Sequence, residues 1–168
     1  RRQMKNLTQQ AKRVIEFNRK AGNGLYDAYT LDFDRSIISQ AALIREEGLE
    51  VEDASQHGDY NHLLKEFCDV FVVVMEGIHR LEKAGFDFEG AMQEVNDNNF
   101  LKIYSSYAEA VEVKEALESR DDKEYFINTN YHNGVPFYVV VNEKGKIMKR
   151  VNHPAVDLSK YLPKGVTQ

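Results

Sequence analysis

Two pairs of acidic residues, each with a spacing of three, are the side chains of this sequence best suited to chemistry. Glu47 and Glu50 form the first pair, and Glu66 and Asp69 form the second. Residues three positions apart lie on one face of a helix, about one turn from each other. If the two segments form antiparallel helices, as the short connection between them favours, the four carboxylates converge on one groove.

Four carboxylates in a partly buried groove suit a hard cation. Mg²⁺ and Mn²⁺ prefer oxygen ligands, and Mg²⁺ keeps several waters that substrate phosphates can replace. We therefore expect Mg²⁺, with Mn²⁺ as a substitute, at a site formed by Glu47, Glu50, Glu66 and Asp69. For Glu47 and Glu50 the alternative is a solvated helix face, because charged residues are mostly exposed.

Asp69 strengthens the metal interpretation, because its apolar surroundings do not fit an ordinary charged surface. It is the only polar residue between Phe67 and Met75. A lone ionised carboxylate in apolar surroundings costs on the order of several kcal/mol, so it should be protonated, paired or bound to a metal. Glu66, three residues earlier, is the nearest partner on the same helix face.

The helix that carries Asp69 is apolar on most sides. One stripe contains Phe67, Val70, Phe71, Val74, Ile78 and Leu81, and a second side contains Cys68, Val72 and Met75. A helix that is apolar nearly all round must be buried nearly all round. We therefore expect another subunit to cover part of it, in a homodimer or homotetramer.

A di-iron bundle is the competing metal interpretation. Glu76 and His79 supply one Glu-x-x-His pair. Such sites need two of these pairs and two further glutamates, and no other histidine has a glutamate three residues before it. The sequence therefore favours the site built from carboxylates alone.

The composition limits the other classes of function. The chain has 168 residues, a net charge of −5 and one cysteine, Cys68. Acidic net charge argues against a nucleic-acid partner, and the longest apolar run, Val70–Met75, is far shorter than the roughly 20 residues of a membrane span. We expect a soluble, cytoplasmic protein without a membrane partner, in which Cys68 is buried.

Apolar periodicity predicts an all-α protein with a four-helix-bundle core and a small C-terminal β-hairpin. The predicted helices cover residues 4–20, 34–54, 60–84, 86–104 and 106–118. Strands are predicted at 125–128, 136–141 and 146–151, with a hairpin turn at Asn142–Gly145, followed by an extended arm at 154–163. Residues 1–120 would form the helical domain, and the hairpin and arm, 121–168, would pack on it.

The two acidic motifs resemble those of the all-α nucleoside triphosphate pyrophosphohydrolases, especially the phage-type MazG-like and phosphoribosyl-ATP pyrophosphohydrolase-like members. Glu-x-x-Glu, fifteen intervening residues and Glu-x-x-Asp match the motif pair of that superfamily. Further similarity lies in the segments 14–18, 43–47, 64–70, 85–87 and 94–102. The chain departs from the family at Asn18, where the family often has His. It also departs at Asn96 and Asp97, where the family has a basic pair.

This resemblance implies a metal-dependent enzyme that cleaves a nucleoside triphosphate between its α and β phosphates. The products would be a monophosphate and pyrophosphate. Glu46 or Glu47 would accept a proton from the attacking water. The resemblance also implies substrate contacts at Glu94, Asn99, Lys102, Phe17 and Asn18.

Two points stay open at the level of the sequence. Phe17, Tyr26 or Phe33 would stack on the base, although aromatic residues at such spacings are usually core. The alternative function is a non-catalytic helical module that binds a nucleotide or a protein and keeps the acidic cluster as structure. That module would bind nucleotide at most, without turnover.

Overall fold

The computed structural model describes residues 7–21 and 31–166. The chain divides into two compact units, one formed by Arg1–Phe88 with Tyr161–Gln168 and the other by Glu89–Lys160. We call these unit 1 and unit 2. The domain boundary predicted near residue 120 therefore falls inside unit 2, and the end of the predicted arm returns to unit 1.

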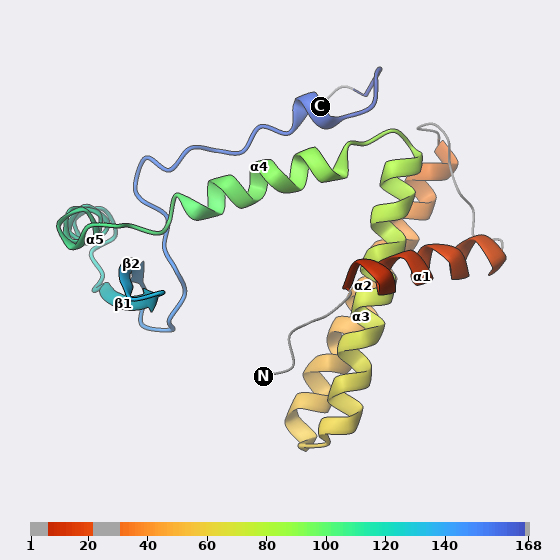
Figure 1. The fold of residues 1–168 in the computed structure, drawn as a ribbon, viewed down its shortest axis with the longest axis horizontal. Helices are drawn as coiled ribbons and strands as arrows, with labels where there is room; N and C mark the ends of the chain where they lie inside the picture. Colours follow the sequence, from red (N-terminus) through yellow and green to blue (C-terminus); the bar gives the residue numbers. More distant parts are fainter. Residues whose placement is uncertain (1–6, 22–30, 167–168) are drawn as a thin grey trace. The chain divides into compact units, whose positions relative to one another are not determined.

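Unit 1 is built on a pair of antiparallel helices. Helix α2 (Leu31–His57) and helix α3 (Tyr60–Lys83) lie side by side, and α1 (Leu7–Ala21) crosses α3 (Figure 1). The turn between α2 and α3 has Gly58 at φ +69° and Asp59 as the N-cap of α3. The Asp59 carboxylate accepts hydrogen bonds from the backbone N–H groups of Asn61 and His62, which are otherwise free at a helix start.

Polar side chains set the alignment of α2 against α3. Gln40 donates a hydrogen bond to the backbone carbonyl of Val73 at 2.8 Å, and Arg80 donates to the hydroxyl of Ser36 at 2.7 Å. Gly77 allows the close approach, because a Cβ built there would lie 3.2 Å from Cγ of Gln40. These contacts fix which residues of the two helices face each other further along the pair.

Part of the apolar surface of α3 is not buried within the chain. Val73 is 8% exposed, whereas Phe67 is 58% exposed and Cys68 is exposed as well. The prediction that Cys68 is buried is therefore wrong, because the face of α3 that carries it borders an open groove between α1 and α3. The structure is mostly helical, as predicted, and the four-helix-bundle core stays a prediction.

Unit 2 combines two helices with a small antiparallel sheet. Helix α4 (Phe88–Phe100) leads from unit 1 into it, and α5 (Tyr107–Asp121) precedes strands β1 (Phe126–His132) and β2 (Val135–Val141). A 3-10 turn, η1 (Ser159–Tyr161), lies where the chain passes from unit 2 back to unit 1. The buried core of unit 2 contains Tyr104, Ala110, Val113, Leu117, Tyr125 and Val140.

The hairpin forms one strand earlier than the sequence prediction placed it. Its turn is Asn133 and Gly134, at φ +50° and +78°, the left-handed pair typical of a two-residue hairpin. The segment predicted as the last strand, 146–151, contributes only an isolated bridge between Ile147 and Val141. On the same edge of β2, three residues before Val141, Tyr138 pairs with Tyr104 through two hydrogen bonds of 2.8 Å.

The same pairing ends α4 early. The sequence predicted a helix up to residue 104, but α4 stops at Phe100. Tyr104 must be extended to bond the backbone of Tyr138, and it is 1% exposed in the core of unit 2. A tertiary contact thus overrides the local helical periodicity.

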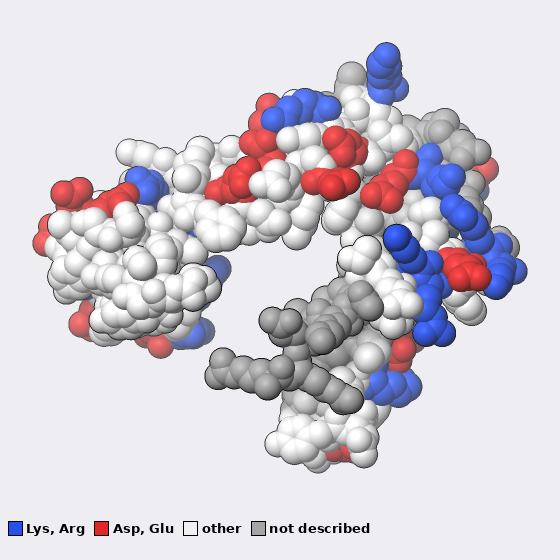
Figure 2. Space-filling model, in the orientation of Figure 1, with Lys and Arg blue, Asp and Glu red and all other residues white. Residues whose placement is uncertain are grey.

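Charge is distributed unevenly over the surface. Figure 2 shows basic side chains gathered over α1 and acidic ones along α4 on the face that is drawn. Helix α1 carries four basic side chains, Lys12, Arg13, Arg19 and Lys20, against one acidic side chain, Glu16. The surface of α1 therefore has the opposite sign to the net charge of the chain. None of the helices in the described ranges combines the length and the hydropathy that crossing a bilayer requires.

Candidate metal centre

The antiparallel pairing of α2 and α3 brings three of the predicted ligands together. Carboxylate oxygens of Glu47, on α2, and of Glu66 and Asp69, on α3, all lie within 4.8 Å of one another. Glu47 and Asp69 are half-buried, and Glu66 is 1% exposed. We call these three residues the acidic cluster. Such a set of close oxygen atoms from two helices is suited to a hard divalent cation.

Glu66 is the most constrained member of the acidic cluster. Its Oε1 accepts a hydrogen bond from Lys65 Nζ at 2.9 Å, and His62 Nε2 lies 2.8 Å from the same oxygen. Its Oε2 is buried and, while Glu50 is ionised, has no hydrogen-bond donor among the described residues. A buried carboxylate oxygen without a donor is costly, and a cation is one of the standard reasons for such an atom to persist.

Lys65 supplies positive charge to two members of the acidic cluster. Its Nζ lies 2.7 Å from Asp69 Oδ2 as well as 2.9 Å from Glu66 Oε1. The hydrogen bond to Lys65 lowers the pKa of Glu66, which keeps this carboxyl ionised. Sequence reasoning gave no role to Lys65 or His62, although His62 and Glu66, and Lys65 and Asp69, have the i, i+4 spacing of helical ion pairs.

Glu50, the fourth predicted ligand, lies next to the acidic cluster without being part of the set of mutually close oxygens. It hydrogen-bonds Glu66, and this bond, together with burial and the charge of Glu66, raises the pKa of Glu50. Two carboxyl groups this close share a proton more easily than they both ionise. A cation bound at the acidic cluster would favour the ionised form of Glu50.

A cleft between α2 and α3 opens next to the acidic cluster. It contains the predicted proton acceptor Glu46 and the half-exposed His62, and its full lining is Glu46, Leu49, Glu50, Asp53, His62, Lys65 and Glu66. Glu46 is exposed, whereas Glu47 is half-buried within the cluster. Water in the cleft can therefore reach Glu46, one of the two predicted proton acceptors, whereas Glu47 is not among the lining residues.

The predicted substrate contacts are distributed over both units. Asn99 and Lys102 lie at the end of α4 and hydrogen-bond each other, and Glu94 pairs with Lys160 at 2.8 Å; all belong to unit 2. Phe17 and Asn18 lie on α1 in unit 1, where Asn18 is 2% exposed. The acidic cluster belongs to unit 1, so the substrate roles of the residues in unit 2 stay predictions.

The aromatic candidates for base stacking differ in their surroundings. Phe33 is 3% exposed and stacks on Phe86 with ring centroids 5.7 Å apart, so it is a core residue. Phe17 is 62% exposed and lines the groove between α1 and α3, away from the cleft that holds the acidic cluster. Tyr26 lies outside the described residues.

The two residues of the competing di-iron interpretation lie outside the acidic cluster. Glu76 accepts a hydrogen bond from Arg80 at 3.0 Å, and His79 is 6% exposed. Burial lowers the pKa of His79, so its neutral form is favoured. Neither residue belongs to the acidic cluster.

Comparison of the chain with models of protein families, with curated proteins and with solved structures gave no match. The acidic cluster and its cleft are therefore the basis for the function that follows.

Proposed function

We propose that the protein is a metal-dependent nucleoside triphosphate pyrophosphohydrolase with its metal site at the acidic cluster. The observation that carries the proposal is the buried Oε2 of Glu66, which has no donor in the described residues while Glu50 is ionised, in a carboxylate that lies beside those of Glu47 and Asp69. The motif spacing of the two acidic pairs supports the choice of reaction.

The residues of the site fit Mg²⁺, or Mn²⁺ in its place. Glu47, Glu66 and Asp69 would hold the ion, and Glu50, next to Glu66, would join them in its ionised form. A divalent ion held there supplies charge that neutralises a triphosphate and lowers the pKa of an attacking water.

The reaction needs one proton acceptor and one leaving group. Water attacks the α phosphorus, the bond from this phosphorus to the oxygen that bridges to the β phosphate breaks, and pyrophosphate leaves. Glu46 or Glu47 takes the proton of the water, since Glu46 lines the cleft and Glu47 belongs to the acidic cluster. Asn99 and Lys102 are proposed to contact the phosphates or the sugar. The helical core would be a four-helix bundle completed in a homo-oligomer.

A second candidate has one observation in its favour. The ammonium of Lys65 already bridges Glu66 and Asp69, so the cluster has positive charge without a metal. In that case the acidic residues stabilise the helix pair of a non-catalytic nucleotide- or protein-binding module.

Pyrophosphate release from a panel of ribo- and deoxyribonucleoside triphosphates separates the two candidates. We expect monophosphate and pyrophosphate with Mg²⁺ and none with a chelator, and the panel ranks the bases. Release of diphosphate and phosphate would show another reaction. Binding of nucleotide without turnover of any triphosphate would favour the non-catalytic module.

A further inference from the structure

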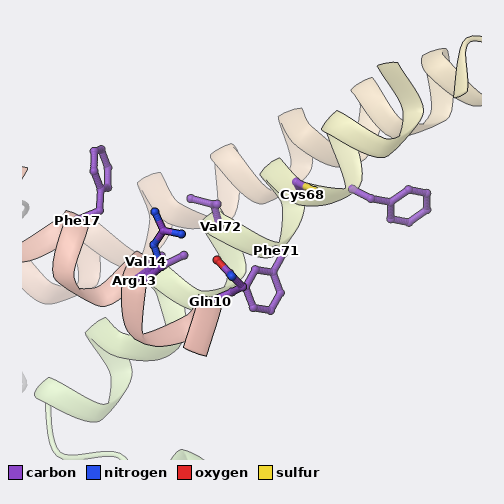
Figure 3. Close-up of a pocket in the computed structure, with 8 residues that line it drawn as sticks. Gln10, Arg13, Val14, Phe17, Cys68, Phe71 and Val72 are labelled. Atoms are coloured by element: carbon purple, nitrogen blue, oxygen red, sulfur yellow. The ribbon is translucent and has the colours of Figure 1, made fainter. Parts of the chain in front are cut away.

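Strand β1 exposes aromatic side chains in unit 2, as the groove between α1 and α3 does in unit 1. The groove is lined by residues that include Phe17 and Phe71 (Figure 3), and it lies on the part of α3 that we expect a second subunit to cover. On β1, Phe126 is 43% exposed and Tyr131 is 74% exposed. Strand β1 differs from the groove because its backbone is open as well.

The outer edge of β1 has backbone groups that pair with nothing in the part of the chain that the structure describes. Thr129 lies opposite Tyr138 in the two-stranded sheet. Tyr138 uses its N–H and its C=O on Tyr104, on the side away from β1. Opposite residues of an antiparallel pair point their backbone groups either toward each other or both outward. Thr129 therefore points its N–H and C=O away from β2, and so do Ile127 and Tyr131, two positions to either side.

Strand β1 lacks the features with which proteins protect an open edge. Its 7 residues, Phe126–His132, include no lysine, arginine, carboxylate or proline, and its pairing with β2 runs without a bulge. Charged side chains, prolines and bulges keep an edge from pairing with another chain. The outer edge of β2, in contrast, is covered at Tyr138 by Tyr104 and at Val140 by Met148. The edge of this sheet that can accept another strand is therefore β1.

Unit 2 does not supply this strand itself. Every residue from 89 to 160 is described, and none of them pairs through its backbone with the outer edge of β1. The segment after β2 is held along α4, where His153 Nε2 lies 2.9 Å from Oδ1 of Asn98 and Lys160 pairs with Glu94 at 2.8 Å. The strand that completes the sheet therefore comes from outside unit 2.

The N-terminal end of β1 is acidic. Asp122 and Glu124 are exposed just before the strand, with Lys123 between them. The nearest preceding basic side chain, Arg120, is already paired with Asp121 at 2.6 Å. The hairpin turn at the other end of β1 has no charged side chain. A segment that runs antiparallel to β1 therefore complements this charge when its own C-terminal end is basic.

We propose that β1 binds an extended peptide segment of another protein, which adds as a third strand antiparallel to β1 and carries lysine or arginine near its C-terminal end. Its backbone bonds the outward N–H and C=O groups of Ile127, Thr129 and Tyr131. Ile127 packs against the core of unit 2, so apolar or β-branched side chains suit the positions of the segment on that face. The acidic cluster takes no part, and this inference does not depend on the proposed catalytic function.

Amide hydrogen exchange of the full chain with a synthetic peptide is the first test. The probe is a short peptide of alternating valine and threonine that ends in lysines. We expect the amides of Ile127, Thr129 and Tyr131 to exchange about tenfold more slowly, or less, at saturating peptide. The amides of Asn128 and Asn130, which point toward β2, should change little. Unchanged exchange at the outward amides would overturn the proposal, as would equal binding of the same peptide ending in glutamates.

Thr129→Pro is the variant that tests the backbone contact. It removes the central outward N–H, and proline is tolerated on an edge strand where its nitrogen faces solvent. We expect the affinity for the peptide to fall by about tenfold or more, whereas Thr129→Val, the matched control that keeps the N–H, binds as the parent chain does. Slow exchange at Asn128 and Asn130 checks that the variant keeps the pairing of β1 with β2. Equal affinity of the two variants would contradict the proposal.

Two further measurements use the parent chain alone. The same peptide N-methylated at every central residue cannot donate backbone hydrogen bonds, so we expect no binding, and binding would overturn the proposal. Exchange at the outward amides without peptide should not depend on protein concentration. Protection that rises with concentration would assign the edge to a second copy of the chain and would also overturn it. None of these tests reads turnover, so this proposal and the proposed function can fail separately.

Discussion

The ammonium group of Lys65 lies 2.7 Å from Oδ2 of Asp69, within the set of carboxylates that the sequence assigns to a divalent cation. A lysine at this distance and a metal ion compete for the same oxygen atoms. The pair therefore links the affinity of the site for a metal to the charge at position 65.

Replacing this lysine should strengthen metal binding. We expect Lys65→Met to bind Mn²⁺ roughly three- to tenfold more tightly than the parent chain, because the cation no longer displaces an ammonium group from Glu66 and Asp69. Calorimetric titration with Mn²⁺ measures the change, and Lys12→Met, on the exposed side of α1, is the control. Unchanged or weaker affinity would place the metal elsewhere.

Asp69 should be required for both binding and turnover. Asp69→Asn keeps the size of the side chain but removes its charge, so we expect Mn²⁺ affinity and pyrophosphate release to fall by about 100-fold or more. Asp53→Asn is the matched control, because Asp53 lines the same cleft and lies outside the acidic cluster. Circular dichroism checks the fold of both variants. Full activity of Asp69→Asn would exclude a role of this residue as a ligand.

Glu50 should make the stability of the metal-free protein depend on pH. The hydrogen bond with Glu66 raises the pKa of Glu50 above its ordinary value of 4.5, so the folded chain holds this proton more tightly than the unfolded chain does. The resulting contribution to the free energy of unfolding is complete below about pH 4.5 and is lost as the pH rises through the raised pKa.

Glu50→Gln is the variant that tests this dependence. Glutamine can donate to Glu66 at every pH, so without metal this variant should be more stable than the parent chain at pH 7, and the difference should shrink toward pH 4. Urea unfolding at several pH values, with a chelator present, measures it. A difference in stability that does not change with pH would mean that Glu50 and Glu66 do not share a proton.

Two helical glycines should respond in different ways to alanine. Nothing lies within 4 Å of a Cβ built at Gly48, so Gly48→Ala should raise the free energy of unfolding by about 1 kcal/mol through helix propensity alone. At Gly77 the Cβ would lie 3.2 Å from Cγ of Gln40, whose amide is held by its hydrogen bond to Val73. Gly77→Ala should therefore be less stable than Gly48→Ala by about 1 kcal/mol or more. Equal stabilities in chemical denaturation would show that Gln40 moves away without cost.

The sequence alone predicted all three residues of the acidic cluster because the information is local. The spacing of Glu66 and Asp69 fixes their common face on one helix, and a two-residue turn at Gly58 and Asp59 makes the neighbouring helix antiparallel. Glu47 then falls opposite them. Glu50 lies outside the cluster because residues three apart differ by about 60° in direction, and only the packing of α2 on α3 decides which of them faces the ligands.

The strand pairing depended on contacts that are distant in the sequence. Two turn signals lie close together, Asn133–Gly134 and Asn142–Gly145, and the sequence prediction chose the second. Backbone pairing of Tyr104 with Tyr138 occupies part of the outer edge of β2, which limits the segment after Asn142–Gly145 to one bridge. The Asn-Gly dipeptide was the signal that could have identified the correct turn.

The points where the chain leaves unit 1 and returns to it lie close together, and this decides whether the segment between them can be replaced. The chain leaves unit 1 after Phe88 and returns at Tyr161, and the backbone N–H of Asp87 donates a hydrogen bond to the carbonyl of Tyr161 at 2.9 Å. The exit and the return are therefore neighbours, which is the arrangement of one domain inserted into another. A short linker in place of residues 89–160 would close the chain of unit 1 without stretching it, so this segment can be exchanged as a cassette between proteins that share the helix pair.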